Sequence, residues 1–331
     1  HHPIPAGHLS PNRAVLVHDF ELCEVRMDQE LEELILEETN SPFTVPTLEQ
    51  VLRLADDGTA LADHLGMSLR QMGMHKELLR RLGNLAFRAM KDMKHCYIGG
   101  SYSRRTALKY HFDVDLVLFI RGFNHNKNKV YQTQLYDGLE RLLYHALQLK
   151  GASLQSMTLC SDFAEFNLLI TGEAAPEKLP SNERKFYAAA YSRTVDEEVL
   201  SFAARHPEFR PFVLLVKHWK YLGSEKIDIS SYHLELLCME IIRQHDSDCL
   251  RDLFWWFLKR VAYSDNRLCV KNLNRFKNQL QVSNEQMTLL ALYAQETLRE
   301  YQWHIRQRSN AVCVSCHRPS TSVAASRYRP L

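Results

Sequence analysis

The sequence HCYIGGSYSRRTALKYHFDVDLVLFIR, from His95 to Arg121, contains a glycine turn and, further on, an alternating pair of acids. Asp113 and Asp115 alternate with apolar residues and lead into a continuous apolar run, which indicates a largely buried strand. Side chains two residues apart on a strand share one face and lie about 6.6 Å apart. We therefore expect two neighbouring carboxylates, close enough to hold a pair of magnesium ions about 4 Å apart.

The glycine turn precedes the acids by about a dozen residues. Gly99 and Gly100 lack Cβ atoms and so let backbone N–H groups approach a triphosphate, and Ser101 adds a hydroxyl. Each pattern alone is commonly a turn or an exposed face, but buried like charges without a counter-ion are costly. Magnesium favours carboxylate oxygens together with substrate phosphates. The two patterns in this order predict nucleotidyl-transfer chemistry with two Mg²⁺ ions, or Mn²⁺ in their place.

The composition is that of an ordinary globular protein. Of the 331 residues, 45% are hydrophobic and 24% are charged, and the formal net charge is only +2. Any nucleic-acid surface must therefore be a local patch. No apolar window is long enough for a membrane span, and the eight cysteines are mostly isolated in apolar stretches. This pattern favours reduced thiols in a cytoplasmic protein.

Changes in composition and periodicity divide the chain into four parts. Residues 1–70 form an N-terminal extension that is partly helical, with an acidic amphipathic segment at 28–38. The catalytic core occupies 71–195, a helical lobe 196–308, and a disordered tail 309–331. The tail contains Cys-Val-Ser-Cys-His at 313–317, but it lacks the second ligand pair that a zinc site would need.

A basic stripe follows the helix predicted over 74–94. It consists of Lys76, Arg80, Arg88 and Lys91, with almost no acid among them. Such a stripe is often only a solvated surface, but this helix leads directly into the glycine turn. We predict that it binds the phosphate backbone of double-stranded RNA, and we assign Arg104 to the same RNA-binding set.

A second strand is predicted over 161–171. Glu165 and Asn167 share one of its faces, where a two-metal site normally has its third acid. The helical period predicts further helices at 131–149, 186–205, 211–221, 233–244, 250–262 and 285–306. Lys217, within one of these helices, is placed to reach a polar cleft. Ser231 and Tyr232 stand just before 233–244, Ser231 to cap that helix and Tyr232 to stack on a base, and we assign all three residues to nucleotide binding. The plainer alternatives are that Lys217 is a surface charge and that Tyr232 is a core aromatic residue.

Several segments jointly resemble the 2′-5′-oligoadenylate synthases and the related animal cyclic GMP-AMP synthase-like receptors. The matching segments, in order over about residues 70–300, are Gly99-Gly100-Ser101, Thr106-Ala107-Leu108, Asp113-Val114-Asp115-Leu116-Val117, Glu165-Phe166-Asn167-Leu168-Leu169, Val216-Lys217-His218-Trp219 and Tyr232-His233-Leu234-Glu235-Leu236-Leu237. Ser230-Ser231-Tyr232-His233 is closer to the cyclic-dinucleotide branch.

The resemblance implies an α+β nucleotidyltransferase fold with two lobes: a twisted mixed sheet with a spine helix, and a C-terminal helical lobe. It implies a template-independent enzyme of innate antiviral defence that is activated by double-stranded RNA or DNA, and the missing Cys/His-rich zinc thumb of the DNA-sensing member favours RNA. The enzyme would make 2′-5′-linked oligoadenylates from ATP, or a cyclic dinucleotide from ATP and GTP. Asp113 and Asp115 are then metal ligands and Ser101 a phosphate contact. Lys217 would bind the donor triphosphate and Tyr232 the base. A poly(A)-polymerase relative would share the metal chemistry but fits the later motifs poorly.

Three positions depart from this family. Asn167 replaces the third metal-binding acid, and an amide ligates weakly and carries no charge to offset two magnesium ions. Leu214 replaces an arginine one turn before Lys217, and a loop motif is matched only loosely by residues 271–275. Glu165 could substitute for the acid only through a register shift or bulge. The alternative is therefore a catalytically impaired member that acts as an RNA-binding sensor, with Asn167 natural or engineered.

Overall fold

The computed structural model describes residues 44–306, apart from gaps at 69–70, 74–78, 81–82, 85, 89, 144–147, 153–155, 161–164, 175–177, 224–226, 246, 265–267 and 275–281. Three features predicted from the sequence lie outside these residues. They are the acidic segment at 28–38, the Lys76 end of the basic stripe, and the tail with its Cys/His motif.

The five described strands form one mixed sheet in the order β1-β2-β5-β4-β3. These strands are β1 (Met93–Gly99), β2 (Asp113–Ile120), β5 (Glu165–Thr171), β4 (Ser156–Cys160) and β3 (Gln148–Ala152). β2 runs parallel to β5, whereas the β1–β2, β4–β5 and β3–β4 pairs are antiparallel. The mixed sheet confirms the predicted fold class, and it places the acid-bearing strand between two partners.

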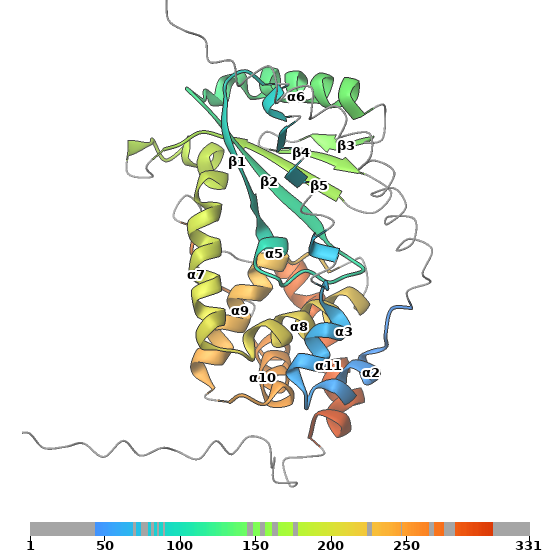
Figure 1. The fold of residues 1–331 in the computed structure, drawn as a ribbon. Helices are drawn as coiled ribbons and strands as arrows, with labels where there is room; N and C mark the ends of the chain where they lie inside the picture. Colours follow the sequence, from blue (N-terminus) through green and yellow to red (C-terminus); the bar gives the residue numbers. More distant parts are fainter. Residues whose placement is uncertain are drawn as a thin grey trace, which may run out of the picture. The chain divides into compact units, whose positions relative to one another are not determined.

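The apolar alternation of β2 explains its central position. Val114, Leu116 and Leu118 are almost fully buried and pack with Phe166 and Leu168 of β5 in one core cluster. Helix α6 (Asn128–Leu143) lies across the sheet and contacts β5 (Figure 1). The helix predicted over 131–149 extends too far at its C-terminal end, because α6 ends at Leu143 and the last two predicted residues belong to β3.

The helical part surrounds helix α8 (Phe209–Leu222), whose side chains from Phe212 to Trp219 are buried. Most of the other members of this core cluster belong to α2 (Leu48–Leu54), α3 (Gly58–Leu65), α7 (Ser192–Arg205), α9 (Ser231–Gln244), α10 (Leu250–Ala262) and α11 (Asn284–Arg306). Trp219 also donates its indole N–H to Thr297 Oγ1 at 2.9 Å. Residues 48–65 therefore pack with the C-terminal helices, and the domain boundaries at 70, 195 and 308 stay predictions.

Several helix ends differ from the sequence prediction for local reasons. The helix predicted over 186–205 is a 3₁₀ helix, η3 (Arg184–Tyr191), followed by α7. Ser230 rather than Ser231 caps α9, because its Oγ accepts the His233 N–H at 3.1 Å. The described residues of the predicted basic helix are helical at 79–80, 83–84 and 86–88, and the helix ends before β1 begins at Met93.

Candidate active site at the start of β2

Asp113 and Asp115 lie at the start of β2, where this strand pairs with β5. Asp113 is opposite Glu165, and Asp115 is opposite Asn167. Because directly opposite residues share a face of the sheet, the side chains of Asp115 and Asn167 meet there. The pairing runs without a register shift from Asp113 to Phe119. The bulge that would bring Glu165 to the position of the third acid is therefore not present.

The glycine turn lies directly beside the acids. Gly99 ends β1 opposite Asp115, and Gly100 begins the short helix α5 (Gly100–Ser103). Gly100 has φ +74°, and a Cβ at this position would be only 2.1 Å from Asp115 Oδ2. Figure 1 shows α5 where β1 and β2 approach the C-terminal helices. Gly100 thus lies against the Asp115 carboxylate, and Ser101, the second residue of α5, is half-buried.

The amide of Asn167 links the two acids. Its Nδ2 donates to Asp113 Oδ2 at 2.9 Å and to Asp115 Oδ1 at 3.3 Å. Its Oδ1 accepts from Thr158 Oγ1 at 3.0 Å, on the neighbouring strand β4. Burial, followed by the charge of Asp113, raises the pKa of Asp115 to about 6. The carboxylates of Asp113 and Asp115 thus lie together at the Asn167 amide, whose hydrogen bonds offset their negative charge only in part.

Lys217 does not reach an open cleft. Its side chain is 5% exposed, and Nζ donates to Glu235 Oε1 at 2.6 Å and to the backbone oxygen of Thr106 at 2.9 Å. Glu235 also accepts from Arg104 Nε at 2.6 Å, and Arg104 Nη1 donates to Asp196. We call Arg104, Asp196, Lys217 and Glu235 the buried ion cluster. Because Lys217 is buried and paired, it is neither the cleft lysine nor the surface lysine that the sequence suggested.

The buried ion cluster joins α5 to three helices of the C-terminal part. Arg104 follows α5, Asp196 lies on α7, Lys217 on α8 and Glu235 on α9. Asp196 Oδ2 further accepts from Tyr97 and Ser103, each at 2.7 Å. Burial disfavours the charged form of Glu235, but Arg104 and Lys217 outweigh it and lower its pKa to about 2. Glu235 therefore stays ionised, whereas burial lowers the pKa of the Lys217 ammonium group. The hydrogen bonds of the cluster fix the glycine turn against the helices.

Tyr232 is only partly available to a base. Its ring packs against the helical core and lies 5.8 Å from the Arg104 guanidinium, and its hydroxyl donates to Asn272 Oδ1 at 3.1 Å. Ser231, the first residue of α9, is exposed beside it. Tyr232 is thus a partly buried ring that packs on the helical core, and its stacking on a base stays a prediction.

The structure adds Lys220 to the residues around the acids. It lies one turn after Lys217 on α8 and is half-buried, and it interacts electrostatically with Asp228 and Asp113. Burial lowers the pKa of its ammonium group. The signal in the sequence was the Lys-x-x-Lys spacing of Lys217 and Lys220, which places both on one side of a helix.

The predicted RNA-binding residues that the structure describes differ in their exposure to solvent. Arg80, Arg88 and Lys91 are exposed, whereas the Arg104 side chain is only 6% exposed and belongs to the buried ion cluster. An arginine with two buried carboxylate partners is not available to a phosphate backbone. Arg104 therefore does not belong with the surface set.

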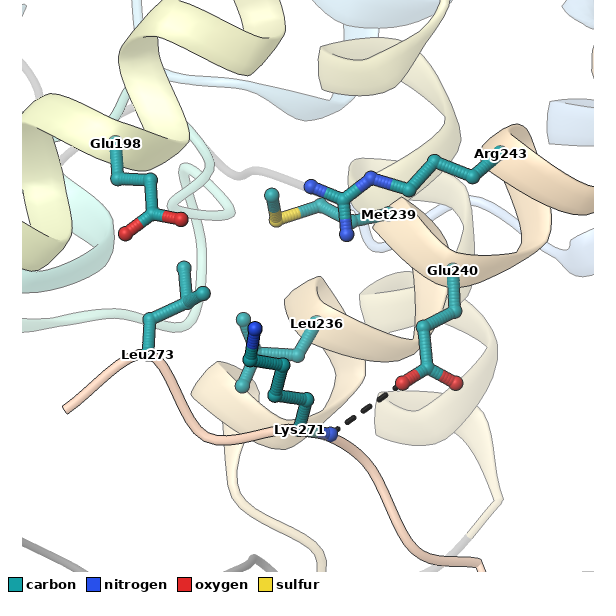
Figure 2. A pocket seen from close by; sticks show the side chains of 7 residues that line it. All are labelled: Glu198, Leu236, Met239, Glu240, Arg243, Lys271 and Leu273. Carbon is teal, nitrogen blue, oxygen red and sulfur yellow. Dashed lines mark hydrogen bonds between the residues drawn. The ribbon is translucent and has the colours of Figure 1, made fainter. Parts of the chain in front are cut away.

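A cavity of about 220 Å³ lies between α7, α9 and the segment 271–273. Figure 2 shows Leu236 and Met239 at its floor, with charged side chains from both sides around it. The charged residues are Glu198, Glu240, Arg243 and Lys271. Glu240 accepts the Lys271 backbone N–H at 3.3 Å. None of the residues predicted for the active site lines this cavity.

Two general properties can be stated for the part of the chain that the structure describes. No group of three or more His, Cys, Asp or Glu side chains is arranged there to hold a metal ion, since the third position beside the aspartates is an amide. No helix among these residues is both long and apolar enough to cross a membrane.

Several solved structures that are similar in fold are nucleotidyltransferases. CdnE, a c-di-GMP synthase from Capnocytophaga granulosa, aligns with a TM-score of 0.58 and 13% identity over 83% of this chain and 93% of its own. CdnC from E. coli MS115-1, solved with a HORMA protein, gives 0.56 and 12% over 74% and 89%. mtPAP bound to GTP gives 0.59 and 10% over 81% and 75%. No protein-family model and no curated protein matches the sequence. The chain therefore has the nucleotidyltransferase fold, as predicted.

Proposed function

We propose that this chain is a template-independent nucleotidyltransferase that uses ATP, alone or with GTP, and is activated by double-stranded RNA. Its product would be a 2′-5′-linked oligoadenylate or a cyclic dinucleotide that signals in cytoplasmic antiviral defence. The observation that carries the proposal is the close approach of Gly100 to Asp115, since the glycine turn that we expect to bind phosphates lies beside one of the two acids. Nucleotide-bound structures of the same fold, with ATP in CdnC and GTP in mtPAP, support the substrate class.

The two carboxylates fit a divalent cation, because both approach one point closely enough to share the Asn167 amide. Asp113 and Asp115 would hold the ion, and a cation would relieve the charge that raises the pKa of Asp115. Bound magnesium would stabilise the phosphate oxygens and activate the attacking ribose hydroxyl. Asn167 would contribute a third oxygen only after its amide turned over, since Oδ1 now faces Thr158.

The remaining residues bind and orient the nucleotide. The backbone at Gly99 and Gly100, with the Ser101 hydroxyl, would receive the phosphates, since no side chain at either glycine blocks their approach. Lys220 would supply the positive charge toward the triphosphate, in place of the buried Lys217. Tyr232 and Ser231 at the start of α9 would contact the base. The ribose hydroxyl would attack the α-phosphorus in line, which breaks the bond to the β-phosphate, transfers the nucleotidyl group and releases pyrophosphate.

Activation by RNA is assigned to the exposed basic residues Arg80, Arg88 and Lys91. Arg80 and Arg88 are helical, Lys91 lies in the turn that leads into β1, and β1 ends at the glycine turn. A duplex bound along this surface could therefore move the turn relative to Asp115.

Pyrophosphate release tests the proposal. The full chain would be incubated with ATP, GTP, magnesium and duplex RNA, and products would be separated by chromatography. We expect pyrophosphate and a nuclease-resistant product, both lost in Asp113→Ala. The control Asp248→Ala removes an exposed carboxylate and should keep the activity. No pyrophosphate from the wild type or from Asn167→Asp, with any nucleotide or duplex, would refute catalysis.

The second candidate is an RNA-binding sensor without catalysis. It is favoured by one observation: the Asn167 amide hydrogens face the position where a cation would bind. For this candidate, Asn167→Asp alone should create activity by restoring the third acid, raising the rate by orders of magnitude. Wild-type turnover comparable with that of Asn167→Asp would exclude it.

A further inference from the structure

Thr158, Asn167 and Asp115 form a row across three neighbouring strands. Thr158 of β4 is opposite Asn167 of β5, which is in turn opposite Asp115 of β2. Opposite residues share one face of a sheet, so the threonine hydroxyl stands behind the amide as seen from the acids. The hydrogen bonds follow this row, from Thr158 Oγ1 to Asn167 Oδ1 and from Asn167 Nδ2 to both carboxylates.

This arrangement opposes a cation at the acids. The Nδ2 group carries two hydrogens, and both carboxylates lie within hydrogen-bond distance of it. A metal ion in contact with both carboxylates would meet these hydrogens instead of an oxygen. The oxygen that could ligate it points to Thr158. An aspartate at this position has oxygens on both sides and would need no rearrangement.

A half-turn about the Cβ–Cγ bond of Asn167 would exchange its oxygen and nitrogen. This torsion is broad and roughly two-fold, so both orientations are accessible. The turned amide presents Oδ1 to the cation and directs Nδ2 at Thr158. A hydroxyl has one hydrogen and two lone pairs, so Thr158 can donate to Oδ1 before the turn and accept from Nδ2 after it.

We propose that Thr158 is a positioning residue that lets the Asn167 amide turn over when a divalent cation binds between Asp113 and Asp115. This inference rests on the proposed function, because it takes the acids as the metal site. With the hydroxyl, both orientations of the half-buried amide are satisfied. Without it, Oδ1 loses its donor before the turn and Nδ2 loses its acceptor after the turn. Because an unpaired buried N–H is tolerated less than an underpaired carbonyl oxygen, the turned amide is the more destabilised, and metal binding is disfavoured.

Two measurements on the full chain test this proposal, and neither depends on turnover. Mn²⁺ affinity is measured from the free-ion electron paramagnetic resonance signal. Thr158→Val should weaken it about tenfold, which is the lower range for loss of an outer-shell hydrogen bond, while Thr158→Ser should bind as the wild type does. Valine is isosteric and suits a strand, and the serine variant shows that the hydroxyl is what matters.

The second measurement follows the Asn167 side-chain amide by ¹H–¹⁵N NMR during a Mg²⁺ titration, with assignment by its loss in Asn167→Asp. We expect both amide proton signals to shift on saturation. Unchanged signals at saturating Mg²⁺, or equal Mn²⁺ affinity in Thr158→Val and wild type, would overturn the inference. Mn²⁺ binding by Asn167→Asp but not by the wild type would overturn it as well. Absence of Mn²⁺ binding in both would instead refute the metal site of the proposed function.

Discussion

Gly100 has a backbone conformation that favours glycine, and it lies directly beside Asp115. Its φ of +74° is a conformation that other residues adopt at a cost of about 1–2 kcal/mol, and an added Cβ would overlap Asp115 Oδ2. Gly100→Ala should therefore lower the free energy of unfolding and displace Asp115, so that nucleotide affinity is lost. Unfolding in urea and calorimetric titration with ATP measure the two effects.

Gly122→Ala is the matched control for this change. Gly122 has φ +62°, but nothing lies within 4 Å of its Cβ position. It should show the conformational cost alone and bind ATP normally. Equal losses in the two variants would mean that the contact with Asp115 contributes nothing.

Asp115 itself is expected to destabilise the metal-free protein. Its folded pKa of about 6 lies above the ordinary value of 3.8, so the charged form is disfavoured in the fold. Stability then falls as pH rises from 3.8 through 6, and the whole cost is present above 6. Asp115→Asn should raise the free energy of unfolding at pH 7.5 by up to about 3 kcal/mol, with no gain below pH 4. Urea unfolding at both pH values, with Asp248→Asn as an exposed control, tests this; a loss of stability at pH 7.5 would contradict it.

Among the elements, β2 and β5 could be predicted because their signal is local. Alternation identified Asp113 and Asp115, and the same period placed Asn167 on a shared face. β4 was missed, although it carries Thr158, because its five residues, SMTLC, contain only a weak alternation and no flanking turn signal. The register that joins Thr158 to Asn167 depends on pairing in the folded sheet, which periodicity cannot specify.

The buried ion cluster shows a second limit of sequence reasoning. Lys217 was placed correctly on a helix, but its partner Thr106 is 111 residues away in the chain, and Glu235 lies on another helix. Helical period tells which residues share a face and not whether a charged one meets a buried partner. The same limit applies to Arg104, which a charge pattern alone assigned to the surface.

Glu235 is expected to be the most sensitive member of the cluster. It is fully buried and accepts hydrogen bonds from Arg104, Thr106 and Lys217. Glu235→Gln removes the charge and leaves two buried cations with Asp196 as their only carboxylate partner in the cluster. Breaking a buried pair costs about 3–5 kcal/mol. Urea unfolding at pH 7 should show this loss, whereas Glu240→Gln on the same helix should cost less than about 1 kcal/mol. A loss in Glu235→Gln as small as that of the control would mean that the cluster is not needed for stability.

For the whole molecule, the burial of His218 predicts sensitivity to mild acid. Burial, with a smaller contribution from His64, lowers the pKa of His218 to about 4, below the 6.5 of an exposed histidine. The unfolded chain therefore binds more protons between these values. Stability contributed by the neutral ring is lost as pH falls from 6.5 through 4, to a limit of about 3 kcal/mol. Urea unfolding between pH 7.5 and 4.5 should show a steeper decline in the wild type than in His218→Gln, while exposed His111→Gln should follow the wild type. Parallel curves for all three proteins would contradict this account.

The low net charge of the whole chain means that RNA binding requires a local basic surface. With a net charge of +2, the protein has little general attraction for a polyanion, so affinity must come from a local group of cations. Arg80, Arg88 and Lys91 are exposed and close together in sequence. Replacing all three by glutamate should abolish most duplex-RNA binding and reduce the dependence of log K on log salt by about three contacts.

A triple variant of equal charge change separates the local surface from net charge. It replaces the exposed residues Arg53, Arg260 and Arg299 by glutamate. Fluorescence anisotropy with a labelled duplex at several salt concentrations should show nearly normal binding for this control, because counterions screen charges beyond about 10 Å. If the basic-helix variant and the control lose affinity equally, net charge is responsible. If the basic-helix variant binds as the wild type does, the duplex does not contact this helix, and activation by RNA would need another surface.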